Sequence, residues 1–239
     1  MLFTLRFRTD HLTLPLGYHA KVQGLIYHLL GSCPDYSAFL HDAGYGTRAK
    51  QFKLFCFSDL TGAHQVRQGK ICFPQHVSFQ LRTADPTMGA LLEEVLLPEQ
   101  PYQLGQQVIW LEEVETAQLH LDAHTVRLRM ASPITVYSSL PDGKTRYYTP
   151  LDPEFSAGIN ANYHHKWRSA TGTNAPGDVE LTAEAVGQRD KCVTQFKGTW
   201  ITAWYGRYQL KGDPQALQFL YHTGLGAKNS MGFGLFDLM

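Results

Sequence analysis

The sequence predicts an α+β fold in which one order of elements, β-α-β-β-α-β, occurs twice. Two observations lead to this prediction. First, the spacing of apolar residues along the chain switches repeatedly between the alternation typical of strands and the three-or-four-residue spacing typical of helices. Second, an Asp-Pro pair begins a helix at the same place in each half, at Asp85-Pro86 and at Asp213-Pro214. A repeated offset of this kind favours a duplicated unit. With 239 residues, 44% of them apolar, the chain can bury a substantial core.

The elements of the first half follow from local patterns. After Pro15, apolar residues at helical spacing form one stripe that Gly31 ends, namely Val22, Leu25, Ile26, Leu29 and Leu30. The predicted order is a strand at 2–8, a helix at 18–30, a short helix from Asp35 to about His41 that ends at Gly44, strands at 52–57 and 70–82, a helix that begins at Asp85-Pro86, and a strand at 108–114.

The second half repeats this order after a linker at residues 116–124. The predicted elements are a strand or strand pair at 126–137 with a turn at 141–143, a helix that begins at Asp152-Pro153, strands near 178–186 and 192–210, a helix that begins at Asp213-Pro214, and a strand at 232–238. This order is the ferredoxin-like motif. We therefore predict two tandem ferredoxin-like domains, residues 1–118 and 125–239.

Charge is distributed unevenly although the net charge is zero. Residues 1–84 hold nine Lys/Arg against four Asp/Glu, 85–124 hold none against eight, 125–190 hold seven of each, and 191–239 hold five against two. The two ends can therefore attract a polyanion, and the acidic segment is expected to face away from it.

The four cysteines are widely spaced, so we expect free thiols, no zinc site and a cytoplasmic protein. No long apolar run occurs, so we expect no membrane span.

A glycine-rich segment ends the chain. Glycines permit backbone conformations with positive φ and let main-chain amides approach a phosphate closely. The spacing fits neither a dinucleotide fingerprint nor a P-loop, so we expect no nucleotide cofactor. We predict a polyanion-binding loop that contains Gly224, Gly226, Lys228, Asn229, Ser230, Gly232, Phe233 and Gly234. The alternative is a tight turn that leads into an edge strand.

Two motifs in this sequence resemble those of CRISPR repeat-processing endoribonucleases of the RAMP superfamily, the Cas-six type. One is the Gly-x-Gly-x5-Gly-Phe-Gly pattern at 224–234, and the other is Leu40-His41-Asp42-Ala43-Gly44-Tyr45. The resemblance implies two ferredoxin-like domains that flank a central cleft for RNA. It also implies that His41 is catalytic, together with Tyr27 and a lysine. Arg48, Lys50 and Lys53 are the candidates for the basic partner, and we choose Lys50.

RNA can be cut without a metal because its 2′-hydroxyl is an adjacent nucleophile. Such an enzyme needs a base, an acid and positive charge near the phosphate, and histidine suits the proton transfers at neutral pH. His41 is expected at a helix end, where the helix dipole favours its charged form. Structural roles remain open for each candidate, because His41 can cap a helix, Tyr27 can border the core and Lys50 can be a solvated surface charge.

Further basic residues extend the predicted RNA surface. Arg207, Lys211 and Lys197 can enlarge a basic face beside the loop. Arginines alternate with apolar residues in two predicted strands and are expected on one face of each sheet, namely Arg6, Arg8, Arg127 and Arg129. Contacts of this kind position RNA through its phosphates without reading its sequence.

The sequence favours a metal-independent endoribonuclease that cuts CRISPR precursor RNA within its repeats and releases guide RNAs with no cofactor. One alternative is a non-catalytic RNA-binding subunit of a CRISPR effector complex. Another is a metal-dependent nuclease, for which Glu93-Glu94 and Glu112-Glu113 are the dense acidic pairs. Repeat RNA is the expected partner, and association of two chains as a homodimer is left open.

Overall fold

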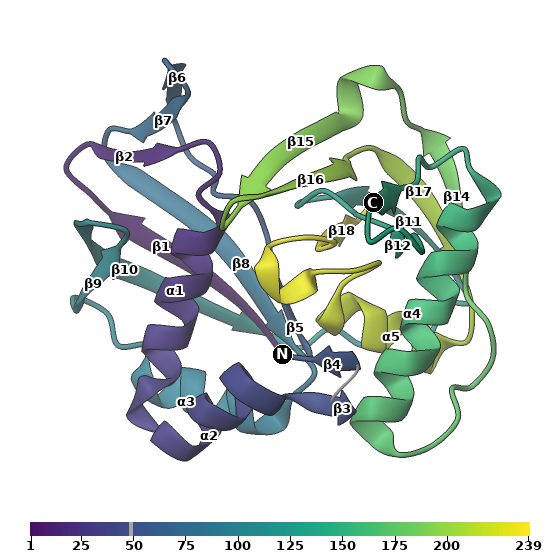
Figure 1. Ribbon diagram of the computed structural model, residues 1–239. Coiled ribbons are helices and arrows are strands. Elements are labelled where there is room, and N and C mark those ends of the chain that lie inside the picture. Colours follow the sequence, from purple (N-terminus) through teal and green to yellow (C-terminus); the bar gives the residue numbers. More distant parts are fainter. Residues whose placement is uncertain (48–49) are drawn as a thin grey trace.

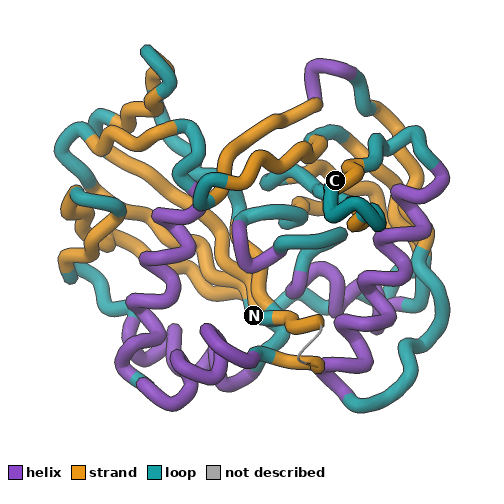
Figure 2. Tube along the Cα trace, in the orientation of Figure 1, coloured by secondary structure: helices purple, strands orange, loops and turns teal. Residues whose placement is uncertain are grey.

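The computed structural model describes residues 1–47 and 50–239, so Arg48 lies outside the described residues. The chain forms two α+β units that lie side by side (Figure 1). Their strands form separate groups in Figure 2. The C-terminal segment, yellow in Figure 1, runs between the two units.

The first unit contains a five-stranded antiparallel sheet in the order β5-β8-β1-β10-β9. Its strands are β1 (Leu2–Arg8), β5 (Phe55–Phe57), β8 (His76–Thr83), β9 (Pro101–Leu104) and β10 (Gln107–Ala117). The helices α1 (His19–Leu29) and α3 (Pro86–Val95) pack their apolar side chains against this sheet. Without the added strand β9, the chain order and the strand order are those of a ferredoxin-like unit.

The second unit repeats this arrangement in a four-stranded antiparallel sheet in the order β14-β17-β11-β18. Its elements are β11 (Thr125–Met130), α4 (Pro153–Thr171), β14 (Glu180–Ala185), β17 (Arg207–Lys211), α5 (Pro214–Thr223) and β18 (Phe236–Leu238). The predicted tandem of ferredoxin-like folds is therefore confirmed.

Smaller elements decorate both units. The first unit adds β2 (Leu12–Pro15), α2 (Pro34–Ala38), a π-helical turn (Phe39–Ala43), β3 (Tyr45–Thr47), β4 (Lys50–Phe52), β6 (Gln65–Arg67) and β7 (Lys70–Phe73). The second adds two hairpins, made of β12 (Tyr137–Ser139) with β13 (Thr145–Tyr147) and of β15 (Lys191–Phe196) with β16 (Thr199–Trp204). Three short 3-10 turns occupy Leu30–Ser32, Gln188–Asp190 and Asn229–Met231.

The predicted Asp-Pro helix starts are confirmed. The carboxylate of Asp85 accepts hydrogen bonds from the amides of Thr87 and Met88, and that of Asp213 accepts one from Gln215. These bonds satisfy amides that have no partner within the first helical turn. The two caps open α3 and α5, the helices that occupy the same position in the two units.

Two long predicted strands are wrong. Residues 70–82 divide at Pro74 into β7 and β8, which belong to different sheets. Residues 192–210 divide into β15, β16 and β17, because Gly198 and Gly206 adopt φ of 87° and 117°. The predicted last strand at 232–238 begins only at Phe236. Only β17 joins the central sheet, and β15 with β16 forms an inserted hairpin.

Each unit has its own hydrophobic cluster. One cluster draws its buried residues from 3–111 and another from 121–236. A small third cluster joins the inserted hairpin to Phe233 of the glycine-rich segment. We propose on this basis the division into domains 1–118 and 125–239.

Buried polar contacts connect the units. Arg82 of β8 is 1% exposed, donates a hydrogen bond of 2.6 Å to the Phe236 carbonyl and pairs with Asp237 at 3.0 Å. Its guanidinium also lies 3.9 Å from the centre of the Tyr221 ring. An Arg side chain removed from water needs such partners, so these contacts set how the two sheets meet.

Two further sequence expectations concern the cysteine thiols and membrane-spanning segments. All four cysteines have free thiols, and Cys56 is buried. Within residues 1–47 and 50–239, no helix is both long and apolar enough to span a bilayer.

Candidate functional site

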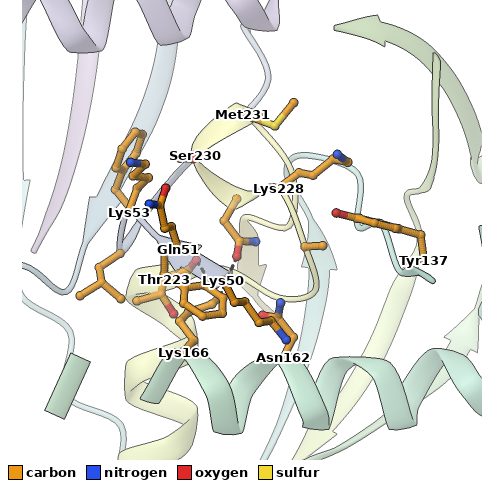
Figure 3. Close-up of a pocket in the computed structure, with 15 residues that line it drawn as sticks. Lys50, Gln51, Lys53, Tyr137, Asn162, Lys166, Thr223, Lys228, Ser230 and Met231 are labelled. Atoms are coloured by element: carbon orange, nitrogen blue, oxygen red, sulfur yellow. Dashed lines mark hydrogen bonds between the residues drawn. The ribbon is translucent and has the colours of Figure 1, made fainter. Parts of the chain in front are cut away.

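Four lysines converge on one pocket between the two units (Figure 3). Lys50 and Lys53 come from the first unit, and Lys166 and Lys228 come from the second. The pocket has a volume of about 310 Å³, and no carboxylate is present among the described residues that line it. None of the acidic residues of 85–124 is among them. A concentration of positive charge with no neutralising partner suits a polyanion.

Lys166 is buried beneath the glycine-rich loop. Its side chain is 2% exposed, and its Nζ donates hydrogen bonds to the carbonyls of Thr223 and Gly224 at 3.2 and 2.8 Å and to Asn229 Oδ1 at 2.7 Å. Three acceptors match the three donors of an ammonium group. Burial lowers the pKa of Lys166 to about 7, because desolvation disfavours the charged form. The lysine therefore links α4 to the loop and titrates near neutrality.

The glycines of the loop are buried and serve close packing. Gly224, Gly226, Gly232 and Gly234 all have positive φ. A Cβ on Gly226 would lie 2.6 Å from the Thr135 carbonyl oxygen. The part of the loop that faces the pocket is its crest, residues 227–231, which is only partly buried. These glycines therefore shape the loop while the crest meets the pocket.

Two predicted RNA-binding side chains have structural contacts instead. The amide of Asn229 donates to the carbonyls of Leu225 and Phe233 at 2.9 and 3.0 Å, and its oxygen accepts from Lys166. The ring of Phe233 is 0% exposed and packs in the third cluster. Asn229 thus holds the loop closed, and Phe233 offers no face to a base. Lys228 and Ser230 do line the pocket.

Replacing Gly234 by alanine is expected to lower the free energy of unfolding by about 2–4 kcal/mol. The added Cβ would overlap the Leu225 carbonyl oxygen, and the residue has φ of 83°. Gly143→Ala is the matched control, because Gly143 has φ of 79° and nothing within 4 Å of an added Cβ. Urea unfolding of both variants separates the steric effect from the backbone effect. Equal losses in the two would contradict the packing role of Gly234.

A second pocket adjoins the first and contains His41. Tyr27, His41 and Lys53 line it together with Ser230 of the loop and Lys197 of the inserted hairpin. The His41 ring lies edge-on to the Tyr27 ring, with 5.8 Å between centroids. Lys53 and Ser230 line both pockets, so the imidazole and the glycine-rich loop lie on the same side of the molecule.

His41 lies in the π-helical turn at the predicted helix end. Its side chain is 71% exposed, and its Nδ1 lies 2.6 Å from Asp42 Oδ1. Asp42 therefore accepts from Nδ1, and Nε2 is the nitrogen free to exchange a proton. The His41 hydrogen bond found among the described residues goes to Asp42, so the ring does not cap the helix carbonyls. π-Helical turns of this kind occur frequently at functional sites.

Tyr27 and Lys53 both contact His41, whereas Lys50 lies in the adjoining pocket. Burial raises the pKa of Tyr27 to about 12. Lys53 Nζ donates a 3.1 Å hydrogen bond to the His41 carbonyl, and burial lowers the pKa of Lys53. Lys50, the lysine chosen from the sequence, lines the four-lysine pocket and lies 5.9 Å from the centre of the Phe52 ring, and burial also lowers its pKa. The structure therefore brings Lys53 to His41 and leaves Lys50 in the adjoining pocket.

The predicted arginines lie elsewhere. Arg129 and Arg207 are opposite each other on β11 and β17 and line a separate pocket beside Asp190. The exposed arginines of the two sheets are on one face of each strand, as predicted, but Arg6 lies 3.6 Å from Glu112 and Arg127 pairs with Glu184. These carboxylates neutralise part of the face. Arg129 and Arg207 therefore do not extend the lysine pocket.

Sequence reasoning missed Asn162, Lys166 and Tyr137, all of which line the four-lysine pocket. Asn162 and Lys166 lie one helical turn apart on α4, and Asn162 Oδ1 is buried with no hydrogen-bond partner among the described residues. A signal for Lys166 was present, because it continues the buried stripe formed by Phe155, Ile159 and Tyr163. A lysine in an apolar stripe is unusual and marks a candidate functional residue.

A metal site would bring several ligand side chains together. In the part of the chain that the structure describes, no three His, Cys, Asp or Glu side chains gather as a metal site would require. Glu112, one of the predicted acidic pairs, instead contacts Arg6 and His76 on the first sheet.

Two ferredoxin-like units that share a pocket define this chain as a tandem ferredoxin-like protein. A solved RAMP protein described as binding different RNA substrates has this fold, with a TM-score of 0.81, 16% identity and 99% of each chain covered. The family described as CRISPR associated protein Cas6, C-terminal, matches residues 115–238. The chain belongs to this Cas6 family.

Relatives cover nearly the whole chain. The CRISPR-associated endoribonuclease Cas6 of Pyrococcus furiosus is 26% identical over 227 residues, which are 92% of this chain and 82% of that protein. A solved Cas6-related protein from Pyrococcus furiosus has a TM-score of 0.85 at 16% identity, with 100% of this chain and 98% of that chain covered. The similarity therefore extends over both units.

Proposed function

We propose that this chain is an endoribonuclease that cuts CRISPR precursor RNA within its repeats and releases guide RNAs. The observation that carries the proposal is the four-lysine pocket, free of carboxylates among its described lining residues, beside a pocket that contains His41 and Tyr27. The family and the endoribonuclease from Pyrococcus furiosus support it. The partner is repeat RNA, and contacts with effector-complex subunits, a homodimer and a cytoplasmic location stay predictions.

The proposed reaction uses the 2′-hydroxyl of the RNA as nucleophile. The 2′-oxygen forms a bond to the adjacent phosphorus while the bond from phosphorus to the 5′-oxygen breaks. One proton leaves the 2′-hydroxyl and another reaches the 5′-oxygen, which gives a 2′,3′-cyclic phosphate and a 5′-hydroxyl. His41 Nε2 exchanges one of these protons. The ammonium groups of Lys50 and Lys53 stabilise the additional charge on the phosphate oxygens.

Incubation of the protein with candidate repeat RNAs in EDTA is expected to give one cut per repeat, with a 2′,3′-cyclic phosphate on the upstream fragment. A single 2′-deoxy nucleotide at the cut site is expected to stop cleavage and to change affinity by less than about three-fold, because only the nucleophile is removed. Gel mapping of fragment ends and fluorescence anisotropy measure the two results. Continued cutting of the 2′-deoxy RNA rejects the nucleophile, and cutting that requires added Mg²⁺ rejects metal independence.

A further inference from the structure

One side of α1 contacts both the glycine-rich loop and the pocket of His41. Side chains four residues apart lie on the same side of a helix, and here they are His19, Gln23 and Tyr27. The first packs against the Phe233 ring, with 5.4 Å between ring centroids. The second donates a 2.8 Å hydrogen bond from Nε2 to the Ser230 carbonyl, and the third meets the His41 ring. A single rigid element therefore connects the crest to the imidazole.

The beginning of α1 is fixed against the second unit. His19 is buried, and its Nε2 lies 2.8 Å from Asp59 Oδ1. The other carboxylate oxygen of Asp59 accepts a 2.5 Å hydrogen bond from the hydroxyl of Tyr205, which directly follows β16. The Asp59 amide also donates to the Ala131 carbonyl at 3.0 Å. The helix thus has a defined position relative to both units, from which the crest can be held.

The hydrogen bond of Gln23 crosses from the first unit to the crest. Gln23 is 9% exposed, so its amide is largely removed from water. Within residues 1–47 and 50–239, it is the only residue of the first unit that forms a hydrogen bond with the crest. The bonds of Lys166 to Asn229 and of the Ala227 amide to the Thr135 carbonyl belong to the second unit. Gln23 is therefore the hydrogen-bonding link between the crest and the unit that carries His41.

We propose that Gln23 is a positioning residue for cleavage. It holds the crest, and with it Lys228, at the distance from His41 at which a phosphate bound by the lysines reaches the imidazole. This inference rests on the proposed function, because it adds a residue to the same site. Gln23 acts through the main chain of Ser230. A displacement of about 1 Å between reacting groups can slow a reaction about 100-fold, so loss of this bond affects the rate more than binding.

The test separates the rate of cleavage from affinity. Gln23→Met keeps much of the side-chain volume and removes the donor. Its single-turnover rate with saturating repeat RNA is expected to fall about 10–100-fold. Its Kd for 2′-deoxy repeat RNA is expected to stay within about three-fold of the parent, because Lys166 still anchors the crest. Gln23→Glu has nearly the same shape and presents a carboxylate to the Ser230 carbonyl, so its rate is expected to fall at least as far.

The matched control is a glutamine of the same unit that also bonds a main-chain carbonyl. Gln107 Nε2 donates to the His11 carbonyl at 3.4 Å, and Gln107 lines neither pocket. Gln107→Met is therefore expected to cut at the parent rate. Urea unfolding of each variant measures the folded fraction at the assay temperature, and rates are expressed per folded protein. A purely structural role for Gln23 would lower stability and leave this rate unchanged.

The outcomes separate this inference from the proposed function. Parent-like rates in both Gln23 variants at saturating RNA overturn the positioning role, while cleavage by the parent protein still stands. A raised Kd with a parent-like rate at saturation assigns Gln23 to binding alone and also overturns it. A parent protein that binds repeat RNA without cutting it overturns the proposed function, and this inference with it.

Discussion

Replacement of His41 by alanine is expected to lower the single-turnover rate of repeat-RNA cleavage by about 10²–10⁴-fold. The imidazole lies edge-on to the Tyr27 ring and shares its pocket with Lys53, beside the four-lysine pocket. Its removal takes away proton transfer and leaves the positive charge of the four-lysine pocket in place. RNA affinity is therefore expected to change by less than about three-fold. Rapid mixing with excess enzyme measures the rate, and anisotropy with 2′-deoxy RNA measures the affinity.

The control for His41 is another exposed histidine of the same unit. His64 lies outside both pockets and contacts the Gly62 carbonyl through Nδ1, so His64→Ala is expected to cut at the parent rate. If His41→Ala cuts as fast as the parent, the proton transfer belongs to another group. If the parent binds repeat RNA but never cuts it, the chain is a non-catalytic RNA-binding subunit.

The order of the main elements could be predicted because its signals are local. Proline and a capping aspartate fix where α3 and α5 begin, whatever packs against them. The strand breaks were harder to predict, because the apolar pattern continues through them. Residues 192–210 stay rich in apolar and aromatic side chains across Gly198 and Gly206. The alternating pattern therefore indicates a strand even where the chain reverses direction.

Site residues could be predicted only where the role of a side chain follows from its own chemistry and its neighbours in the sequence. His41 and Tyr27 were predicted from motif and helix position, and the structure places their rings in contact. Asn229 and Phe233 could not be assigned in the same way, because their roles depend on partners distant in sequence. Lys166 reaches Asn229 across 63 residues, and Phe233 packs against the inserted hairpin. A motif identifies the loop but not which of its side chains turn inward.

Replacement of Lys166 is expected to cause a large loss of RNA affinity. Lys166→Met preserves much of the side-chain volume and removes the hydrogen bonds to Gly224 and Asn229. The loop crest then loses its anchor on α4, and affinity for 2′-deoxy repeat RNA is expected to fall about ten-fold or more. Lys211→Met is the control and is expected to bind like the parent, because Lys211 is exposed at the end of β17 and lines a separate pocket with Asp178 and Glu180 instead of extending the basic face as predicted. Parent-like affinity in Lys166→Met would mean that the crest holds its position without this lysine.

Comparison of the parent protein with Lys166→Met also tests the pKa of Lys166. Its pKa is about 7 in the folded protein and 10.5 for an ordinary lysine, so between these values the unfolded chain holds a proton that the folded chain has released. The free energy of unfolding of the parent should therefore rise with pH relative to Lys166→Met, by up to about 1.4 kcal/mol per pH unit from pH 7 upward. Below pH 7 both states hold the proton, and the difference should be constant. Urea unfolding from pH 6 to 9.5 measures this difference, and a flat difference above pH 7 would show that the buried ammonium keeps its proton through its three acceptors.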